Sequence, residues 1–498
     1  MNTKLQLSRL ASSGVPGLDA VVLGGLKRRH IYLIEGMPGA GKTTLALQFL
    51  LEGARQKERC LYVTLSETER ELRNTAQSHG WSLDGVTIFE VMPLEADPEQ
   101  QQSMIYSSEV ELDQTVSLII QKVRELNPDR LVIDALTELR LLAQDALSYR
   151  RQVLALRRYF AQSRSTVLAL DDLTDLKPGL QLHSIVHGVF NLEQRRLEYG
   201  ATRRRLSIIK LRGANYRSGY HDFVIRTGGI TVFPSLVAAE HETKFTPGAF
   251  SSQIAELDAL LGGGLRRGTS TLLIGPSGVG KSSMALQFAV AASKKGQRVA
   301  IFAFDEAYRT ASDRARGLGL DLDGARESGH LIWTRCSPTT ISPGEFVDEA
   351  QRQVNAGVGM VIIDSLNSYM ISMPEEQTLL LHMHELLAYL GNKGIVTILL
   401  LAQRGLVGST EAPLDVSFLA DTIVLMRYFE AEGEVRKAVS VLKSRSGRHE
   451  TAIREYRLNS KQGVSVGPPI RDFQGVLTGV PTFIGSPGSL PHMPHDAS

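Results

Sequence analysis

Residues 36–43 read Gly36-Met-Pro-Gly-Ala-Gly-Lys42-Thr43, and residues 275–282 read Gly275-Pro-Ser-Gly-Val-Gly-Lys281-Ser282. Both stretches fit the pattern G-x-x-x-x-G-K-[ST] in full. The glycines let successive backbone N–H groups point into one concavity that holds phosphate oxygens, and the lysine reaches the β- and γ-phosphates. Two plain glycine-rich turns would not explain why lysine and then a hydroxyl follow in both. The sequence therefore predicts two nucleotide-binding sites.

The predicted site extends to a magnesium ion, because the hydroxyls of Thr43 and Ser282 follow the lysines as Mg²⁺ ligands. An acidic group at the end of a buried strand would hold the ion through water, and Asp134 and Asp364 each follow an apolar run. An aspartate that merely ends a strand is the alternative. The predicted ATP-binding residues are Gly36, Pro38, Gly39, Ala40, Gly41, Lys42, Thr43 and Thr44, with Gly275, Ser277, Gly278, Val279, Gly280, Lys281, Ser282 and Ser283.

Acidic residues follow the next apolar run in each half, and they are candidates for orienting the water that attacks the γ-phosphate. The runs are Leu65-Ser66-Glu67-Thr68 and Phe304-Asp305-Glu306-Ala307. A carboxylate at this point can polarise a water in line with the phosphate, which makes Glu67, Asp305 and Glu306 candidate catalytic residues. Surface carboxylates or helix N-caps are the alternative interpretation.

The order of these landmarks repeats along the chain. Lys42 recurs as Lys281, and the strand that ends at Asp134 recurs as the strand that ends at Asp364. This indicates a tandem duplication, with a first domain over 1–240, a second over 241–484 and a flexible tail over 485–498 rich in Gly, Pro and Ser.

Within each half, buried apolar runs alternate with helical stretches, which predicts an α/β fold with a mainly parallel sheet flanked by helices. The first half has predicted strands at 30–35, 61–65, 131–134 and 166–170, and predicted helices at 43–55 and 116–126. Each phosphate loop would then join a core strand to a helix whose N-terminus faces the nucleotide.

Composition excludes several other classes of protein. The 498 residues are 43% hydrophobic and 22% charged with a net charge of +2, which gives no support for a dedicated nucleic-acid or membrane surface. Two cysteines cannot make a disulfide framework or a four-cysteine zinc site. The chain shows neither a membrane-spanning run nor a signal peptide, so a cytoplasmic location is expected.

Beyond the two loops, several segments resemble the KaiC proteins, RecA-like ATPases of the circadian-clock type. These segments are the entry Ser13-Gly-Val-Pro-Gly-Leu-Asp19, the turn Leu261-Gly-Gly-Gly-Leu265, Lys210-Leu-Arg-Gly213, Ala452-Ile-Arg-Glu-Tyr456 and Gly475-Val-Leu-Thr-Gly-Val-Pro481. The resemblance covers roughly residues 10–485 and implies two tandem RecA-like P-loop NTPase domains.

The resemblance further implies a double-ringed homo-hexamer with ATP and Mg²⁺ bound between neighbouring subunits, and KaiB-like or other signalling partners. Lys210 and Arg212, with Lys443 and Arg445 in the second ring, would then reach the neighbour's γ-phosphate. Without the resemblance, such Lys-x-Arg pairs read as solvated side chains.

In this family the second domain also phosphorylates adjacent hydroxyl residues. Here Ser417 stands at the serine position, but Phe418 stands where a threonine is usual, so a two-site cycle is excluded. Phosphorylation of Ser417 and a purely structural hydroxyl both remain open. The family's paired glutamates also change, to Ser66-Glu67 in the first half and Asp305-Glu306 in the second.

Three functions follow from the sequence: a KaiC-like ATPase with serine autokinase activity, a nucleotide-gated signalling scaffold, or a DNA-dependent RecA-like motor. The balanced charge makes nucleic acid an unlikely partner. The arginine-rich stretch 195–205 resembles a DNA-binding patch, but the spacing around Gly200 favours a hairpin that leads into the Lys210 strand.

Overall fold

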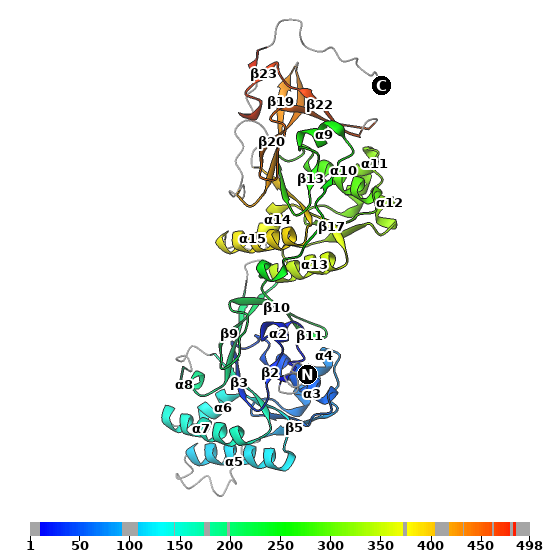
Figure 1. Cartoon of the computed structure of the whole chain (residues 1–498). Coiled ribbons are helices and arrows are strands. Elements are labelled where there is room, and N and C mark those ends of the chain that lie inside the picture. The colour runs from blue at the N-terminus through cyan, green and yellow to red at the C-terminus, as the bar shows by residue number, and fades with distance from the viewer. Residues whose placement is uncertain are drawn as a thin grey trace. The chain divides into compact units, whose positions relative to one another are not determined.

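The computed structural model describes residues 10–91, 108–143, 145–173, 180–196, 200–371, 376–403, 418–431, 433–460, 463–478 and 482–484. Contacts divide the chain into two compact units, Met1–Ser235 and Leu236–Ser498 (Figure 1). Ser417 and the predicted tail over 485–498 lie outside the described residues.

The first unit is built on a nine-stranded sheet in the order β11-β10-β9-β8-β3-β7-β6-β4-β5. The strands from β5 to β8 run parallel, and β9, β10 and β11 continue the sheet antiparallel. The strands of the unit are β1 (Leu10–Ala11), β2 (Leu26–Lys27), β3 (Ile31–Gly36), β4 (Cys60–Thr64), β5 (Val86–Glu90), β6 (Arg130–Asp134), β7 (Thr166–Asp172), β8 (Gly188–Arg195), β9 (Arg203–Leu211), β10 (Tyr220–Arg226) and β11 (Gly229–Phe233). Its helices are α2 (Leu18–Val21), α3 (Lys42–Arg55), α4 (Glu69–Ser78), α5 (Ser108–Leu126), α6 (Leu136–Leu142), α7 (Ala146–Gln162) and α8 (Leu180–His183).

Both faces of this sheet are covered by helices. Successive side chains of a strand point to opposite faces, so a continuous apolar strand needs a packing partner on each face. On β3, Tyr32 and Ile34 pack in a cluster with α3, whereas Leu33 packs in a cluster with α5 and α7. Figure 1 shows α5 and α7 side by side in this unit. The apolar strands are therefore buried on both sides, as parallel strands between two helical layers must be.

The second unit repeats this architecture with the order β16-β15-β17-β18-β14-β19-β20-β21-β22, in which the strands from β16 to β19 are parallel. Its strands are β12 (Ala249–Phe250), β13 (Leu265–Arg266), β14 (Ser270–Gly275), β15 (Arg298–Ala303), β16 (Leu331–Arg335), β17 (Val358–Asp364), β18 (Val396–Ala402), β19 (Thr422–Ala431), β20 (Glu434–Ser444), β21 (Arg454–Asn459), β22 (Gly463–Pro469), β23 (Phe473–Gln474) and β24 (Thr482–Phe483). Its helices are η1 (Ala238–His241), α9 (Ala255–Leu260), α10 (Lys281–Lys294), α11 (Tyr308–Gly317), α12 (Leu322–Glu327), α13 (Pro343–Asn355), α14 (Leu366–Ile371), α15 (Glu376–Asn392) and η2 (Val476–Thr478).

The predicted fold class is confirmed: each unit has a mostly parallel sheet with helices on both faces. The four predicted strands of the first half correspond to β3, β4, β6 and β7, and the two predicted helices to α3 and α5. Helix α5 begins at Ser108, eight residues before the predicted start. Strand β7 continues to Asp172, two residues beyond the predicted end, and this difference matters for the site.

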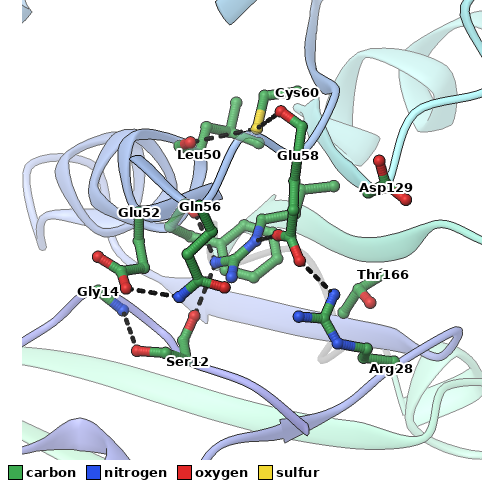
Figure 2. A network of polar contacts seen from close by, with 12 residues as sticks. Ser12, Gly14, Arg28, Leu50, Glu52, Gln56, Glu58, Cys60, Asp129 and Thr166 are labelled. Atoms are coloured by element: carbon green, nitrogen blue, oxygen red, sulfur yellow. Dashed lines mark hydrogen bonds and ion pairs between the residues drawn. The ribbon is translucent and has the colours of Figure 1, made fainter. Parts of the chain in front are cut away.

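A buried arginine fastens helix α3 to strand β6 in the first unit. Arg130, at the start of β6, is fully buried, and its guanidinium lies 4.6 Å from the ring centroid of Phe49 on α3. Its Nε donates to Glu58 (2.5 Å), and Nη1 donates to the carbonyl oxygens of Ser12 (2.7 Å) and Phe49 (2.8 Å). Figure 2 shows Glu58 also reaching Arg28, at 2.5 Å. Strand β6 ends at Asp134 and α3 begins at Lys42, so this contact joins the two elements that carry residues of the predicted site.

The second unit has apolar and neutral residues where the first unit has this ion pair. Strand registers place Met360 opposite Val299, as Arg130 lies opposite Cys60, and the residue equivalent to Glu58 is Gln297. Met360 is fully buried in the core below α10. A charged pair and a neutral pair therefore occupy the same place in the two copies.

We expect Arg130→Met to lower the free energy of unfolding of the first unit by about 3 kcal/mol, because Glu58 loses a buried partner. Adding Glu58→Gln should recover about 1 kcal/mol, since it removes a carboxylate that keeps only Arg28 as its partner among the described residues. The measurement is urea denaturation in a Trp333→Phe background, where Trp81 alone reports. Arg59→Met is the control; its pair with Asp129 spans 3.9 Å with Arg59 53% exposed, so about 1 kcal/mol or less is expected. A double variant no more stable than Arg130→Met would contradict the argument.

Candidate nucleotide-binding sites

The first predicted phosphate loop joins the end of β3 to the start of α3. Gly39 and Gly41 adopt φ values of 79° and 109°, the left-handed region that glycine tolerates best. Ala40 between them is fully buried and anchors the loop to the core. The backbone therefore turns sharply before Lys42 and brings the N-terminus of α3, with its unpaired N–H groups, to the carboxyl edge of the sheet.

The second loop follows the same path between β14 and α10. Gly278 and Gly280 have φ values of 77° and 114°, and Val279 between them is fully buried. The remaining predicted ATP-binding positions lie on these two loops or in the first turn of the helix that follows, with Pro38 and Ser277 in the loops and Thr44 and Ser283 in the helices. Their contact with a nucleotide stays a prediction.

The lysine of the first loop lies among three protein oxygens. Nζ of Lys42 donates to the carbonyl oxygens of Gly36 (2.8 Å) and Met37 (3.1 Å). It also lies 2.5 Å from Oδ1 of Asp172, the last residue of β7. Sequence analysis missed Asp172, because β7 was expected to end at Leu170. The doublet Asp171-Asp172 directly after an apolar run was the signal that could have revealed it.

The lysine of the second loop has a different environment. Nζ of Lys281 donates to the carbonyl oxygens of Gly275 and Pro276, both at 2.8 Å. Within the described residues no carboxylate lies within 4 Å of it. Burial lowers the pKa of Lys281 to about 8, against a smaller opposing effect of the Asp364 carboxylate.

The predicted magnesium ligands come together in both units. Oγ1 of Thr43 donates to Oδ2 of Asp134 at 3.3 Å, and Ser282 hydrogen-bonds Asp364 in the second unit. Burial raises the pKa of both aspartates. A hydroxyl beside a carboxylate, both with oxygen donors, fits Mg²⁺, which binds through one or two carboxylates plus substrate phosphates. Tyr62, which sequence analysis missed, donates its hydroxyl to Asp134; nothing in the strand sequence marks it.

Glu67 lies near the first site. Its pKa is raised by burial, by the charge of Asp134 and, third, by that of Glu71. The Oε2 atom of Glu67 is buried and has no hydrogen-bond partner among the described residues. The backbone of Glu67 is fixed by Thr64, whose hydroxyl donates to the carbonyl oxygen at 2.6 Å. A half-buried, unsatisfied carboxylate next to Asp134, the predicted magnesium ligand, is suited to accept a proton from water.

The two acids of the second unit are hydrogen-bonded within their own chain. Asp305 accepts from the hydroxyls of Ser365 (2.6 Å) and Ser368. Glu306 binds both terminal nitrogens of Arg314, at 2.5 and 2.8 Å. The charges of Glu306 and Asp305 contribute to the raised pKa of Asp364, after burial, which places both near the second site. Their catalytic role stays a prediction, and Arg314 was not foreseen because it lies eight residues further on, inside α11, where the sequence does not show which way its side chain points.

The predicted γ-phosphate-binding lysines and arginines lie at the amino ends of the parallel strands. The two phosphate loops lie at the carboxyl ends of the same strands. The backbone N–H of Arg212 donates to His187, whose own N–H donates to Ile31 at the start of β3, about 16 Å from the end of that strand. Likewise Arg445 donates to Asp421, which donates to Ser270 at the start of β14. Lys210 and Arg212 therefore cannot reach the phosphate loop of their own unit.

A cavity of about 470 Å³ at this edge of the first unit is strongly basic. Its polar lining consists of the guanidinium and imidazole groups of Arg28, Arg29, His30, Arg157, His187 and Arg212. Burial and, next, the nearby His30 lower the pKa of His187 to about 4. Within the described residues no carboxylate pairs with Arg29, Arg157 or Arg212. The cavity is thus a candidate site for an anion, because its positive charge is not neutralised by the described residues of this unit.

The arginine-rich stretch forms the predicted hairpin. Strand β8 pairs antiparallel with β9, with Arg195 opposite Arg203, although residues 197–199 of the turn lie outside the described residues. Arg205 pairs with Glu193 at 3.2 Å and lies over the ring of Tyr220.

Comparison with known proteins agrees with this arrangement. The family model described as "ATPase: KaiC" matches residues 11–237 and again residues 250–471. The chain belongs to the KaiC ATPase family. It is 27% identical over 486 residues to the circadian clock protein KaiC3 of Synechocystis sp., with 95% of this chain and 94% of the relative covered. It is 27% identical over 480 residues to the circadian clock oscillator protein KaiC of Parathermosynechococcus lividus, covering 95% and 88%.

A third relative, the circadian clock oscillator protein KaiC of Synechococcus elongatus, is 26% identical over 480 residues, covering 94% of this chain and 91% of the relative. The predicted family is therefore confirmed, and the tandem match places one KaiC domain in each unit. As for membranes, none of the helices in the described part of this KaiC family member has the length and hydrophobicity needed to span one.

The lowered pKa of Lys281 predicts a pH-dependent stability of the second KaiC domain. Between pH 8 and the ordinary value of 10.5, the unfolded chain binds a proton that the folded domain does not, so the free energy of unfolding rises with pH. Lys281→Met should remove this rise, about 3 kcal/mol at most, and be the more stable form at pH 7. The measurement is urea denaturation of both forms in a Trp81→Phe background, where Trp333 alone reports. If the free energy of unfolding changed with pH equally in the two forms, the result would contradict the argument that burial lowers the pKa of Lys281.

Proposed function

We propose that this KaiC family member binds Mg²⁺-ATP in both domains and hydrolyses it in a homo-hexamer, with each nucleotide between neighbouring copies. The observation that carries the proposal is that the residues predicted to bind Mg²⁺-ATP lie far from the cations predicted to contact the γ-phosphate. In each domain the loop lysine, the hydroxyl and the buried aspartate lie at one sheet edge, whereas Lys210, Arg212, Lys443 and Arg445 lie at the other. A second copy would supply the missing cations, which stabilise charge on the γ-phosphate.

In this proposal Thr43 and Asp134, with Ser282 and Asp364, hold the Mg²⁺, which neutralises charge on the β- and γ-phosphates. Glu67 orients the attacking water in the first domain. Asp305 and Glu306 are the candidates in the second. Asp305 is exposed and accepts from two serine hydroxyls, whereas Glu306 is held by the charged Arg314, so Asp305 is favoured as the proton acceptor.

We further propose that the second domain phosphorylates Ser417. The described segment directly after it supports this, because the carbonyl oxygen of Ala420 accepts from Lys443 at 2.9 Å. Phe418 beside it is 49% exposed. The segment therefore lies at the sheet edge that would face a neighbour's γ-phosphate. Circadian-type regulation is proposed from the names of the relatives. A KaiB-like or other signalling partner is proposed from the family resemblance alone.

A nucleotide-gated scaffold is the second candidate, favoured by the ion pair that occupies Glu306 and by the serine at position 66. Incubation of the intact protein with γ-labelled ATP separates the two. The autokinase predicts label on the protein that disappears with Lys281→Ala and with Ser417→Ala. ATP turnover without label on the protein would rule out the autokinase. If ATP is not hydrolysed and the protein is not labelled, the result favours the scaffold. A strong rise in turnover with single-stranded DNA would favour the DNA-dependent motor instead.

Supply of cations by a neighbour is testable by mixing inactive variants in a Lys281→Ala background. Lys42→Ala and Arg212→Ala should each lower first-domain turnover at least about a hundredfold. Subunits of the two, dissociated and reassembled together, should regain about a quarter of the parental turnover, because some interfaces then combine an intact loop with an intact arginine. The assay is phosphate release, and each variant reassembled alone is the control. No recovery in the mixture would show that Arg212 does not act across an interface.

A further inference from the structure

Asp172 places a carboxylate inside the first phosphate site. Its Oδ1 atom lies 2.5 Å from Nζ of Lys42, whose side chain is 8% exposed. The backbone of Asp172 is fixed on both sides, because it lies opposite Gly36 in the sheet and its N–H donates to Thr137 at 2.9 Å. With two carbonyl oxygens also bound, all three N–H donors of the ammonium have protein acceptors.

The second domain has the same backbone without this carboxylate. Ala402 lies opposite Gly275 at the end of β18, as Asp172 lies opposite Gly36, and its N–H donates to Asn367 at 2.7 Å. Lys281 is bound only by two carbonyl oxygens. The duplicated domains therefore differ by one charged side chain at the atom that binds phosphate.

We propose that Asp172 competes with the nucleotide phosphates for Lys42 and makes the first site the weaker of the two. A phosphate that takes Lys42 must displace a close, mostly buried ion pair and then lie beside a carboxylate of the same charge. The second site carries no such cost. At limiting ATP the second domain fills first, so the first domain senses the higher range of nucleotide concentration. This inference rests on nucleotide binding in the proposed function, but not on hydrolysis or phosphorylation.

The test is a binding titration of the full chain with a fluorescent ATP analogue and Mg²⁺, in a Lys281→Ala background that isolates the first site. Asp172→Asn should tighten binding on the order of tenfold, because the amide keeps the shape of the side chain and removes its charge. Asp84→Asn removes the same charge from an exposed turn at the start of β5, and should leave the affinity unchanged. Thermal unfolding of each form checks that the fold is intact.

The reciprocal change tests the same idea by adding the carboxylate to the second site instead of removing it from the first. Ala402→Asp, in a Lys42→Ala background, should weaken binding at the second site by a similar factor. Unchanged affinity in both swaps would overturn the proposal. Weaker binding with Asp172→Asn would overturn it too, since Asp172 would then help to hold the nucleotide or its metal ion. Because the readout is binding, an absence of turnover would contradict the proposed function alone.

Discussion

The structure depends on a close approach of backbone to backbone beside each phosphate loop. A Cβ atom at Gly36 would overlap the carbonyl oxygen of Leu192 on β8, and one at Gly275 would overlap that of Met426 on β19. Only glycine lets the central strand end this close to its parallel neighbour. The loop must then turn away from the sheet, which starts the next helix at the carboxyl edge. The meeting of Lys42 and Thr43 with Asp134 follows from that one constraint.

Where the two domains differ, they differ in sets of interacting residues. Arg130 with Glu58 in the first unit corresponds to Met360 with Gln297 in the second. The buried guanidinium group of the first unit thus has a carboxylate partner, and the buried apolar side chain of the second unit needs none. The acids at the site change together as well. The first domain has Ser66 in place of Asp305 but gains Asp172 in place of Ala402. The first loop also has Glu35 and Asp171 beside it, where the second has Ile274 and Leu401, so the carboxylates around the two loop lysines differ in number as well as in position.

Sequence predicted the parts whose chemistry fixes residue type and spacing: both loops, the aspartates at the ends of β6 and β17, and the alternation of strands and helices. It did not predict partners that only tertiary structure brings together. A fully buried arginine such as Arg130 contradicts the usual exposure of that residue. The Glu306–Arg314 pair joins a residue that precedes α11 to one eight positions later within that helix. Nor could it position Ser417, which lies outside the described residues.

The basic edge of the first domain concentrates positive charge around one imidazole group. Arg29, Arg157 and Arg212 gather around His187, whose pKa falls far below its usual value, first through burial and then through the nearby His30. A folded domain tolerates such repulsion only at a modest cost in stability, which an anion from outside would reverse. The corresponding backbone position in the second domain is Asp421, which accepts from Ser270 and carries no such positive charge. In the proposed assembly, a phosphate bound by another copy would therefore relieve more repulsion between positive charges in the first domain than in the second.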